Sequence, residues 1–175
     1  KHAFRRLADR LGIVYTPVEI VDFIIHSVAH VLETEFGETL GSRGVHILDP
    51  FTGTGTFIAR LIQSGLISPK ELPRKYREEI HANEIVLLAY YIAAVNIEAA
   101  YHGVVGGKYE PFEGICLTDT FQMYERDDLL AALMVDNSRR RERQRKLDIR
   151  VIIGNPPYSI GQESQNDNNQ NVKYP

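Results

Sequence analysis

Short apolar runs alternate along the chain with longer stretches whose apolar residues recur at helical spacing. The first helical stretch follows Thr16-Pro17 and ends before Gly37. Its apolar positions are Val18, Val21, Ile25, Val28 and Leu32. We expect a helix here, with Thr16 as its cap, Pro17 in its first turn and Gly37 as its stop signal.

Four apolar runs predict buried strands, at residues 45–48, 80–84, 114–121 and 150–154. Further helical patterns cover residues 56–63, 85–101 and 127–146. The stretch 64–77 contains Gly65, Pro69 and Pro73, and we expect it to be a long connection. Because strands alternate with helices, the sequence predicts an α/β fold with a parallel sheet.

The stretch 85–101 is almost wholly apolar, but it is short for a membrane span. We therefore expect a helix buried against the sheet, and no membrane partner. One apolar stripe at helical spacing is expected to face that sheet. It consists of Ile85, Leu88, Ile92, Val95 and Ala99.

The 175 residues are 43% hydrophobic and 25% charged, which is typical of a globular domain. We expect a helical element at 1–37, an α/β core at 38–160 and a polar loop at 161–175, where Asn and Gln dominate. The first residue is a lysine, which favours a piece of a longer protein. The single cysteine, Cys116, cannot form an internal disulfide and favours a reducing, cytoplasmic location.

The net charge is −3, but residues 139–146 form a strongly basic run. A solvated helix face is the simpler interpretation of this run, and contact with nucleic-acid phosphates is the alternative. No spacing of cysteines and histidines resembles a metal site, so we expect no metal.

The segment that links the first strand to its helix reads Asp49-Pro50-Phe51-Thr52-Gly53-Thr54-Gly55. Its glycines let a ligand approach the backbone, and the helix start behind them favours anionic groups. The dinucleotide pattern fails, because Ile58 stands at its third glycine, and no phosphate-loop lysine follows. Asp49 repels a pyrophosphate but suits a cationic amino group. A ligand with an α-amino group and a ribose, such as S-adenosylmethionine, therefore fits better than NAD. A plain strand–helix turn is the alternative.

Two further acids, Glu84 and Asp119, stand at the ends of the next two predicted strands. In nucleoside-binding α/β folds, an acid at the second strand end accepts hydrogen bonds from ribose hydroxyls. Asp119 stands where an adenine amino group could be recognised. Either acid alone is weak evidence, but three acids at successive strand ends on one sheet edge reinforce each other.

The most specific feature follows the fourth strand and reads Asn155-Pro156-Pro157-Tyr158. These residues suit methyl transfer to an exocyclic ring amine, whose delocalised lone pair makes it a poor nucleophile. The Asn155 side-chain oxygen and the Pro156 carbonyl can accept the two amine hydrogens and free that lone pair. Consecutive prolines hold the carbonyl still, and Tyr158 offers a ring on which an extruded base can stack. A turn that merely ends the strand is the simpler alternative.

Taken together, these elements resemble the N6-adenine DNA methyltransferases of restriction–modification systems. The segments that carry the resemblance are Gly12–Pro17, Asp49–Gly55, Glu84, Thr118–Phe121 and Asn155–Tyr158, in the order of the gamma group. The resemblance implies a doubly wound, Rossmann-like sheet that binds S-adenosylmethionine and is incomplete in this chain.

The resemblance also implies roles for the matching residues. It assigns the methionine end of the cofactor to Tyr15, Thr16, Pro17, Asp49, Pro50, Phe51, Thr52, Gly53 and Gly55. It assigns the ribose to Glu84, and the cofactor adenine to Asp119 and Thr120. It assigns catalysis to Asn155, Pro156, Pro157 and Tyr158.

The stretch 154–175 is similar to the methyltransferase part of single-chain Type ISP restriction–modification enzymes. That similarity implies double-stranded DNA as a partner, attached helicase, nuclease and target-recognition domains, and no activity for this piece alone. Two alternatives stay open. One is a methyltransferase for RNA or protein glutamine, and the other is a cofactor- and DNA-binding module without chemistry.

Overall fold

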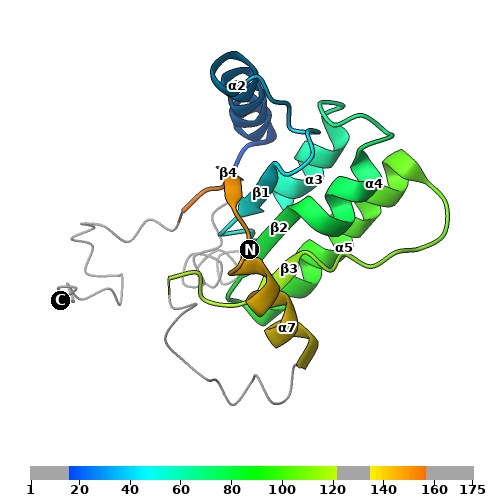
Figure 1. The fold of residues 1–175 in the computed structure, drawn as a ribbon. Helices are drawn as coiled ribbons and strands as arrows, with labels where there is room; N and C mark the ends of the chain where they lie inside the picture. Colours follow the sequence, from blue (N-terminus) through cyan, green and yellow to red (C-terminus); the bar gives the residue numbers. More distant parts are fainter. Residues whose placement is uncertain (1–15, 122–134, 157–175) are drawn as a thin grey trace, which may run out of the picture.

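A four-stranded parallel sheet forms the centre of the molecule (Figure 1). The computed structural model describes residues 16–121 and 135–156. The strands are β1 (His46–Asp49), β2 (Ile80–Glu84), β3 (Ile115–Leu117) and β4 (Ile149–Ile152). Their spatial order is β3-β2-β1-β4. The predicted parallel sheet is therefore confirmed, and its third strand is shorter than expected.

The helices are α2 (Val18–Phe36), α3 (Thr56–Gln63), α4 (Leu72–Arg74), a π-helical turn η1 (Lys75–Glu79), α5 (Leu87–Val105) and α7 (Val135–Gln144). Helices α3 and α5 pack against each other on one side of the sheet (Figure 1). Helix α2 packs on α3, and α7 packs along β3 before the chain enters β4. The first part of the helix predicted at 127–146 lies outside the described residues.

The core lies between the sheet and the pair α3 and α5. All five residues of β2 are buried, as expected for a central strand of a covered parallel sheet. Ile47 and Ile80 from the strands meet Ile58, Leu61 and other apolar residues of α3 in one cluster. Among the described residues, no helix has the length and hydropathy to cross a membrane.

Helix α5 exists as predicted, but it turns a different face to the sheet. The buried residues are Ala89, Tyr90, Ala93, Ile97, Ala100 and Tyr101. The predicted stripe is instead exposed, with Leu88 68% and Val95 63% accessible. The prediction of the buried face was wrong because the helix is apolar on both sides, and the smaller alanine face allows α3 to approach closely.

The stretch 64–77 is more ordered than the predicted connection, because it contains α4 and the start of η1. Lys75 is completely buried, forms an ion pair with Glu79 at 3.1 Å and donates from its Nζ to the Val45 carbonyl. Glu79 also pairs with Arg74 and accepts the Gly44 N–H at 2.8 Å. This polar cluster fixes the connection beneath the amino ends of β1 and β2.

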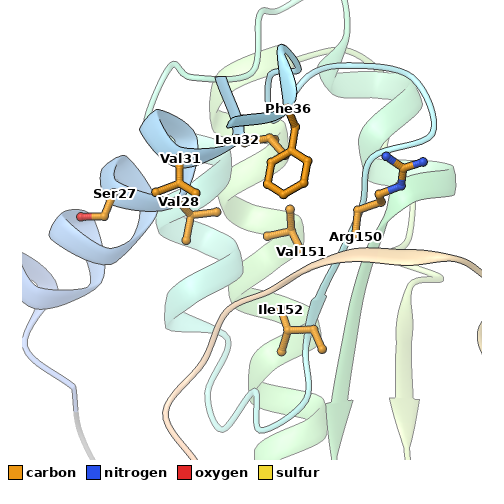
Figure 2. A pocket seen from close by; sticks show the side chains of 8 residues that line it. All are labelled: Ser27, Val28, Val31, Leu32, Phe36, Arg150, Val151 and Ile152. Carbon is orange, nitrogen blue, oxygen red and sulfur yellow. The ribbon is translucent and has the colours of Figure 1, made fainter. Parts of the chain in front are cut away.

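An apolar groove runs between α2 and the outer strand β4 (Figure 2). It is lined by Ser27, Val28, Val31, Leu32, Phe36, Arg150, Val151 and Ile152. Ile152 is 66% accessible, and β4 has no neighbouring strand on its outer edge within the described part of the chain. None of the predicted site residues lines this groove.

Candidate active site

The sheet order places a topological switch point between β1 and β4. From β1 the chain moves towards β2 and β3, and it then returns to the other side of β1 as β4. In open α/β sheets, ligands bind outside the carboxyl ends of the strands at such a point. Leu48 and Ile152 are level in the β1–β4 register, so the glycine turn and Asn155 leave the sheet at the same edge.

The two glycines of the turn have different tasks. Both have positive φ, 56° at Gly53 and 87° at Gly55, where a side chain would be strained. A Cβ on Gly55 would also lie 3.1 Å from the Ala93 backbone of α5, so this glycine lets α3 and α5 meet. A Cβ on Gly53 would meet nothing within 4 Å, so the backbone there is open on that side.

Asp49, at the end of β1, is completely buried. Its Oδ1 accepts the Phe51 N–H at 3.1 Å, and its Oδ2 has no hydrogen-bond partner in the described part of the chain. A Cβ on Gly154 would lie 2.6 Å from Oδ1, so the carboxyl packs against the chain that leaves β4. Burial raises the pKa of Asp49 to about 7; the Phe51 N–H opposes this rise and nearby Glu84 adds to it.

Replacing Asp49 with asparagine should therefore stabilise the fold more as the pH rises. Between pH 4 and 7 the folded chain keeps a proton on Asp49 that the unfolded chain releases, so the free energy of unfolding of the parent falls with pH. The asparagine variant escapes this loss. We expect its advantage to grow by about 2 kcal/mol between pH 5 and 8 in urea titrations.

Asp22 supplies a control for this measurement. The Arg60 hydrogen bond holds the pKa of Asp22 below its usual value, against the opposing effect of burial and with help from Coulombic attraction. Asp22→Asn should thus change stability by the same amount at pH 5 and pH 8. If the stability gain of Asp49→Asn were also the same at pH 5 and pH 8, the pKa of the buried Asp49 carboxyl would not be raised.

Glu84, at the end of β2, fastens the glycine turn to the sheet. Its Oε2 accepts the Gly53 N–H at 2.7 Å, and its Oε1 accepts the N–H groups of Ile85 at 2.9 Å and Val86 at 2.7 Å. Among the described residues, Oε2 accepts this one hydrogen bond and so retains acceptor capacity. The same carboxylate can therefore hold the turn and still accept a ligand hydroxyl.

The segment after β3 is tied to the turn after β1. The Thr120 hydroxyl donates to the Pro50 carbonyl at 2.7 Å, and the Phe51 and Phe121 rings lie 5.4 Å apart. The Asp119 Oδ1 accepts the Phe121 N–H at 2.9 Å. Phe121 is 74% accessible, so an exposed aromatic ring lies at this edge of the sheet beside the acids.

Two apolar residues at this edge had no predicted role in ligand binding. Ile85 is 63% accessible directly after Glu84, and Phe121 stands two positions after Asp119. An exposed apolar side chain next to a strand-end acid suits the flat face of a base. The sequence signal that could have identified these two residues is an apolar side chain one or two positions after a strand-end acid.

Asn155 contacts the segment that precedes α2. Its Nδ2 donates to the Thr16 Oγ1 at 3.1 Å. The expected capping role of Thr16 is not observed: Pro17 is the N-cap residue of α2, and no side chain caps the helix. Pro156 is exposed beside Asn155, whereas Tyr15, Pro157 and Tyr158 lie outside the described residues.

The structure thus gathers the predicted residues that it describes at one edge of the sheet. They are Thr16, Pro17, Asp49, Pro50, Phe51, Thr52, Gly53, Gly55, Glu84, Asp119, Thr120, Asn155 and Pro156. Within the described ranges, no three His, Cys, Asp or Glu side chains could hold a metal ion.

The basic run begins on α7 and ends just beyond it, and its charge is partly neutralised. Arg139 pairs with Asp136 at 3.0 Å, and Arg145 pairs with Glu142 at 2.8 Å. Arg140 donates to the Tyr90 hydroxyl at 3.3 Å. These contacts agree with the simpler interpretation, a solvated helix face.

Comparisons with known proteins agree with this geometry. The profile of the family described as N-6 DNA methylase matches residues 2–175. One similar structure is that of a nuclease-deletion mutant of the Type ISP restriction–modification enzyme LlaGI in complex with a DNA substrate mimic. Its sequence is 53% identical, and the TM-score is 0.82. The match covers 93% of this chain and 14% of that one. The ATP-dependent Type ISP restriction–modification enzyme LlaBIII, bound to DNA, is 52% identical with a TM-score of 0.78, over 86% of this chain and 10% of that one.

A third similar structure is the DrdV–DNA complex, which is 48% identical with a TM-score of 0.85, over 97% of this chain and 16% of that one. This chain therefore spans only a small part of each of these three proteins. The comparison with curated protein sequences found no match.

Proposed function

The chain belongs to the N-6 DNA methylase family, and from that premise we propose that it transfers a methyl group from S-adenosylmethionine to the N6 amine of adenine in DNA. The observation that carries the proposal is the position of Asn155, which follows β4 at the switch point and has its Nδ2 held by Thr16. Its Oδ1 is the end of the amide that remains available to accept a hydrogen from the target amine.

The residues at the sheet edge fit this cofactor. The buried, unpaired Asp49 Oδ2 suits a nearby cationic amino group, and Glu84 Oε2 retains acceptor capacity for a ribose hydroxyl. The backbone at Gly53 is open on the side where a side chain would point. Ile85 and Phe121 offer apolar faces for the adenine ring.

Asn155 and Pro156 activate the target. Their two carbonyl oxygens accept the two hydrogens of the adenine amine and draw the nitrogen towards tetrahedral geometry, which frees its lone pair. S-adenosylmethionine, when bound, supplies an electrophilic methyl group on a sulfonium that is a good leaving group. We further assign Tyr158 to stacking with the extruded base, which offsets the cost of removing that base from the duplex.

We also propose that the chain is the methyltransferase domain of a Type ISP-like enzyme. The relatives LlaGI and LlaBIII are Type ISP restriction–modification enzymes, and both structures contain DNA or a DNA mimic. Their similarity favours attached helicase, nuclease and target-recognition domains and a cytoplasmic location. It also favours 1–37 as the element that brings the Tyr-Thr-Pro motif to the core at 38–160.

Methyl transfer from labelled S-adenosylmethionine tests the proposed function in the complete protein that carries this chain. DNA, RNA and a glutamine-containing peptide are offered in parallel, and the product is identified by mass spectrometry after digestion. We expect N6-methyladenine in DNA alone. Label in RNA or in the peptide would favour the corresponding alternative, and cofactor binding without any transfer would favour the non-catalytic module.

Replacing Glu84 with glutamine should weaken binding of S-adenosylmethionine by about tenfold or more. A glutamine has one acceptor oxygen, so its NH2 must face either the Gly53 N–H or the N–H groups after β2, and the turn loosens. Calorimetry measures the affinity, and Glu33→Gln on the exposed side of α2 is the matched control. Unchanged affinity in a folded Glu84→Gln variant would remove Glu84 from the cofactor site.

A further inference from the structure

We infer that Thr16 is a positioning residue for Asn155, which it holds with the amide oxygen directed to the target amine. The hydrogen bond from Asn155 Nδ2 to Thr16 Oγ1 is 3.1 Å long and joins side chains 139 positions apart. This inference rests on the proposed function, since it gives Asn155 the role of acceptor.

The start of α2 leaves the Thr16 hydroxyl available for this contact. Pro17 is the N-cap residue, and its carbonyl accepts the N–H groups of Ile20 and Val21 at 3.0 and 3.1 Å. The helix therefore begins without a side-chain cap. In the described part of the chain, Asn155 is the only hydrogen-bond partner of the Thr16 hydroxyl.

The ring of Pro17 limits where that hydroxyl can lie. Proline has a fixed φ and restricts the residue before it to extended conformations, so the backbone of Thr16 is held by its neighbour. Pro17 itself has φ −55° and ψ 138°. The backbone that carries the Thr16 hydroxyl therefore has few accessible conformations.

The chemistry of the amide explains why such a support matters. An asparagine side chain has an acceptor at one end and two donors at the other. If the NH2 faced the adenine amine, two donors would meet, and neither amine hydrogen would be accepted there. A hydroxyl that accepts from Nδ2 keeps the NH2 occupied and leaves Oδ1 directed elsewhere.

The half-buried position of Asn155 increases the effect of this hydrogen bond. A donor that is partly withdrawn from water needs a protein partner, and the hydrogen bond to Thr16 supplies one. The carbonyl of the next residue, Pro156, is already assigned to the target amine. Without Thr16, the amide is free to rotate about its last side-chain bond, and a smaller fraction of molecules has the reactive arrangement.

The test compares Thr16→Val with Thr16→Ser in the complete protein that carries this chain. Valine keeps the shape but removes the hydroxyl, whereas serine keeps the hydroxyl. We expect Thr16→Val to lower the single-turnover rate of methyl transfer at saturating cofactor and DNA by about tenfold, as for the loss of one neutral hydrogen bond. Its affinity for S-adenosylmethionine should fall less than the rate does, and Thr16→Ser should restore most of the rate.

Thr34→Val is the matched control, because within the described ranges the Thr34 hydroxyl bonds to backbone carbonyls of its own helix, α2, and to nothing else. It should leave the transfer rate unchanged. A normal rate for Thr16→Val would overturn the inference, as would weaker cofactor binding with an unchanged rate at saturation, which would assign Thr16 to the cofactor alone. Equal losses in the valine and serine variants would show an effect of packing and would overturn it too.

Asn155→Ala, measured alongside, separates this inference from the proposed function. If Asn155→Ala is inactive and Thr16→Val is normal, only the role of Thr16 is wrong. If Asn155→Ala remains active, Asn155 is not the acceptor, and both the mechanism and this inference fail.

Discussion

Asn155→Ala should reduce methyl transfer by at least about 100–1,000-fold while the affinity for S-adenosylmethionine stays within a few fold. The variant removes one of the two acceptors that free the lone pair of the target amine. It leaves the strand-end acids and the glycine turn in place, because the Asn155 side chain forms its hydrogen bond within the described residues with Thr16. Label transfer to DNA measures the rate, and calorimetry measures cofactor affinity.

Asn155→Asp is the matched control for that loss. A carboxylate keeps an acceptor for the amine, and the Thr16 hydroxyl can reverse its role and donate to the other oxygen. This variant should therefore retain far more activity than Asn155→Ala. Equal losses in both variants would show that the amide NH2 is essential, and an active Asn155→Ala enzyme would refute the assigned chemistry.

The sequence was informative about this site because each acid or amide stands at the end of an apolar run. The runs before Asp49, Glu84 and Asn155 became β1, β2 and β4, and parallel strands bring their carboxyl ends to one edge. Local pattern and the rule for parallel sheets therefore sufficed to bring these side chains together.

The buried face of α5 could not be predicted, because apolar character is distributed all around this helix. The face that packs contains Ala89, Ala93 and Ala100, and the Ala93 backbone would lie 3.1 Å from a Cβ on Gly55. Close approach of two helices selects small residues, whereas a search for the largest apolar stripe selects Leu88 and Val95. A row of alanines was the better signal.

Contacts between distant segments were equally inaccessible to pattern analysis. Thr16 has the residue type of a helix cap, but in the fold its hydroxyl accepts from Asn155. Lys75 and Glu79 have the residue types of a solvated connection, but both are buried. In each case the local preference of a side chain yields to a partner that only the tertiary structure supplies.

The buried pair Lys75–Glu79 leads to the second large expected effect, on stability. Glu79→Ala should lower the free energy of unfolding by about 3–5 kcal/mol, because it leaves the fully buried Lys75 ammonium without its carboxylate. The variant also leaves the Gly44 N–H without its acceptor, because this N–H donates to Glu79 at 2.8 Å. Burial would raise the pKa of Glu79, but the Gly44 N–H and Lys75 outweigh it and hold this pKa below its usual value. Urea titration at neutral pH measures the loss.

Two further variants serve as comparisons for Glu79→Ala. Lys75→Met removes the buried charge and leaves Glu79 with Arg74 and the Gly44 N–H, so it should cost clearly less than Glu79→Ala. Asp136→Ala breaks an ion pair whose side chains are 76% and 78% accessible, and it should change stability by less than about 0.5 kcal/mol. The order Glu79→Ala, then Lys75→Met, then Asp136→Ala follows from the uncompensated charge that each variant leaves in the interior. A Glu79→Ala variant as stable as Asp136→Ala would mean that the connection does not bury Lys75 beneath the sheet in solution.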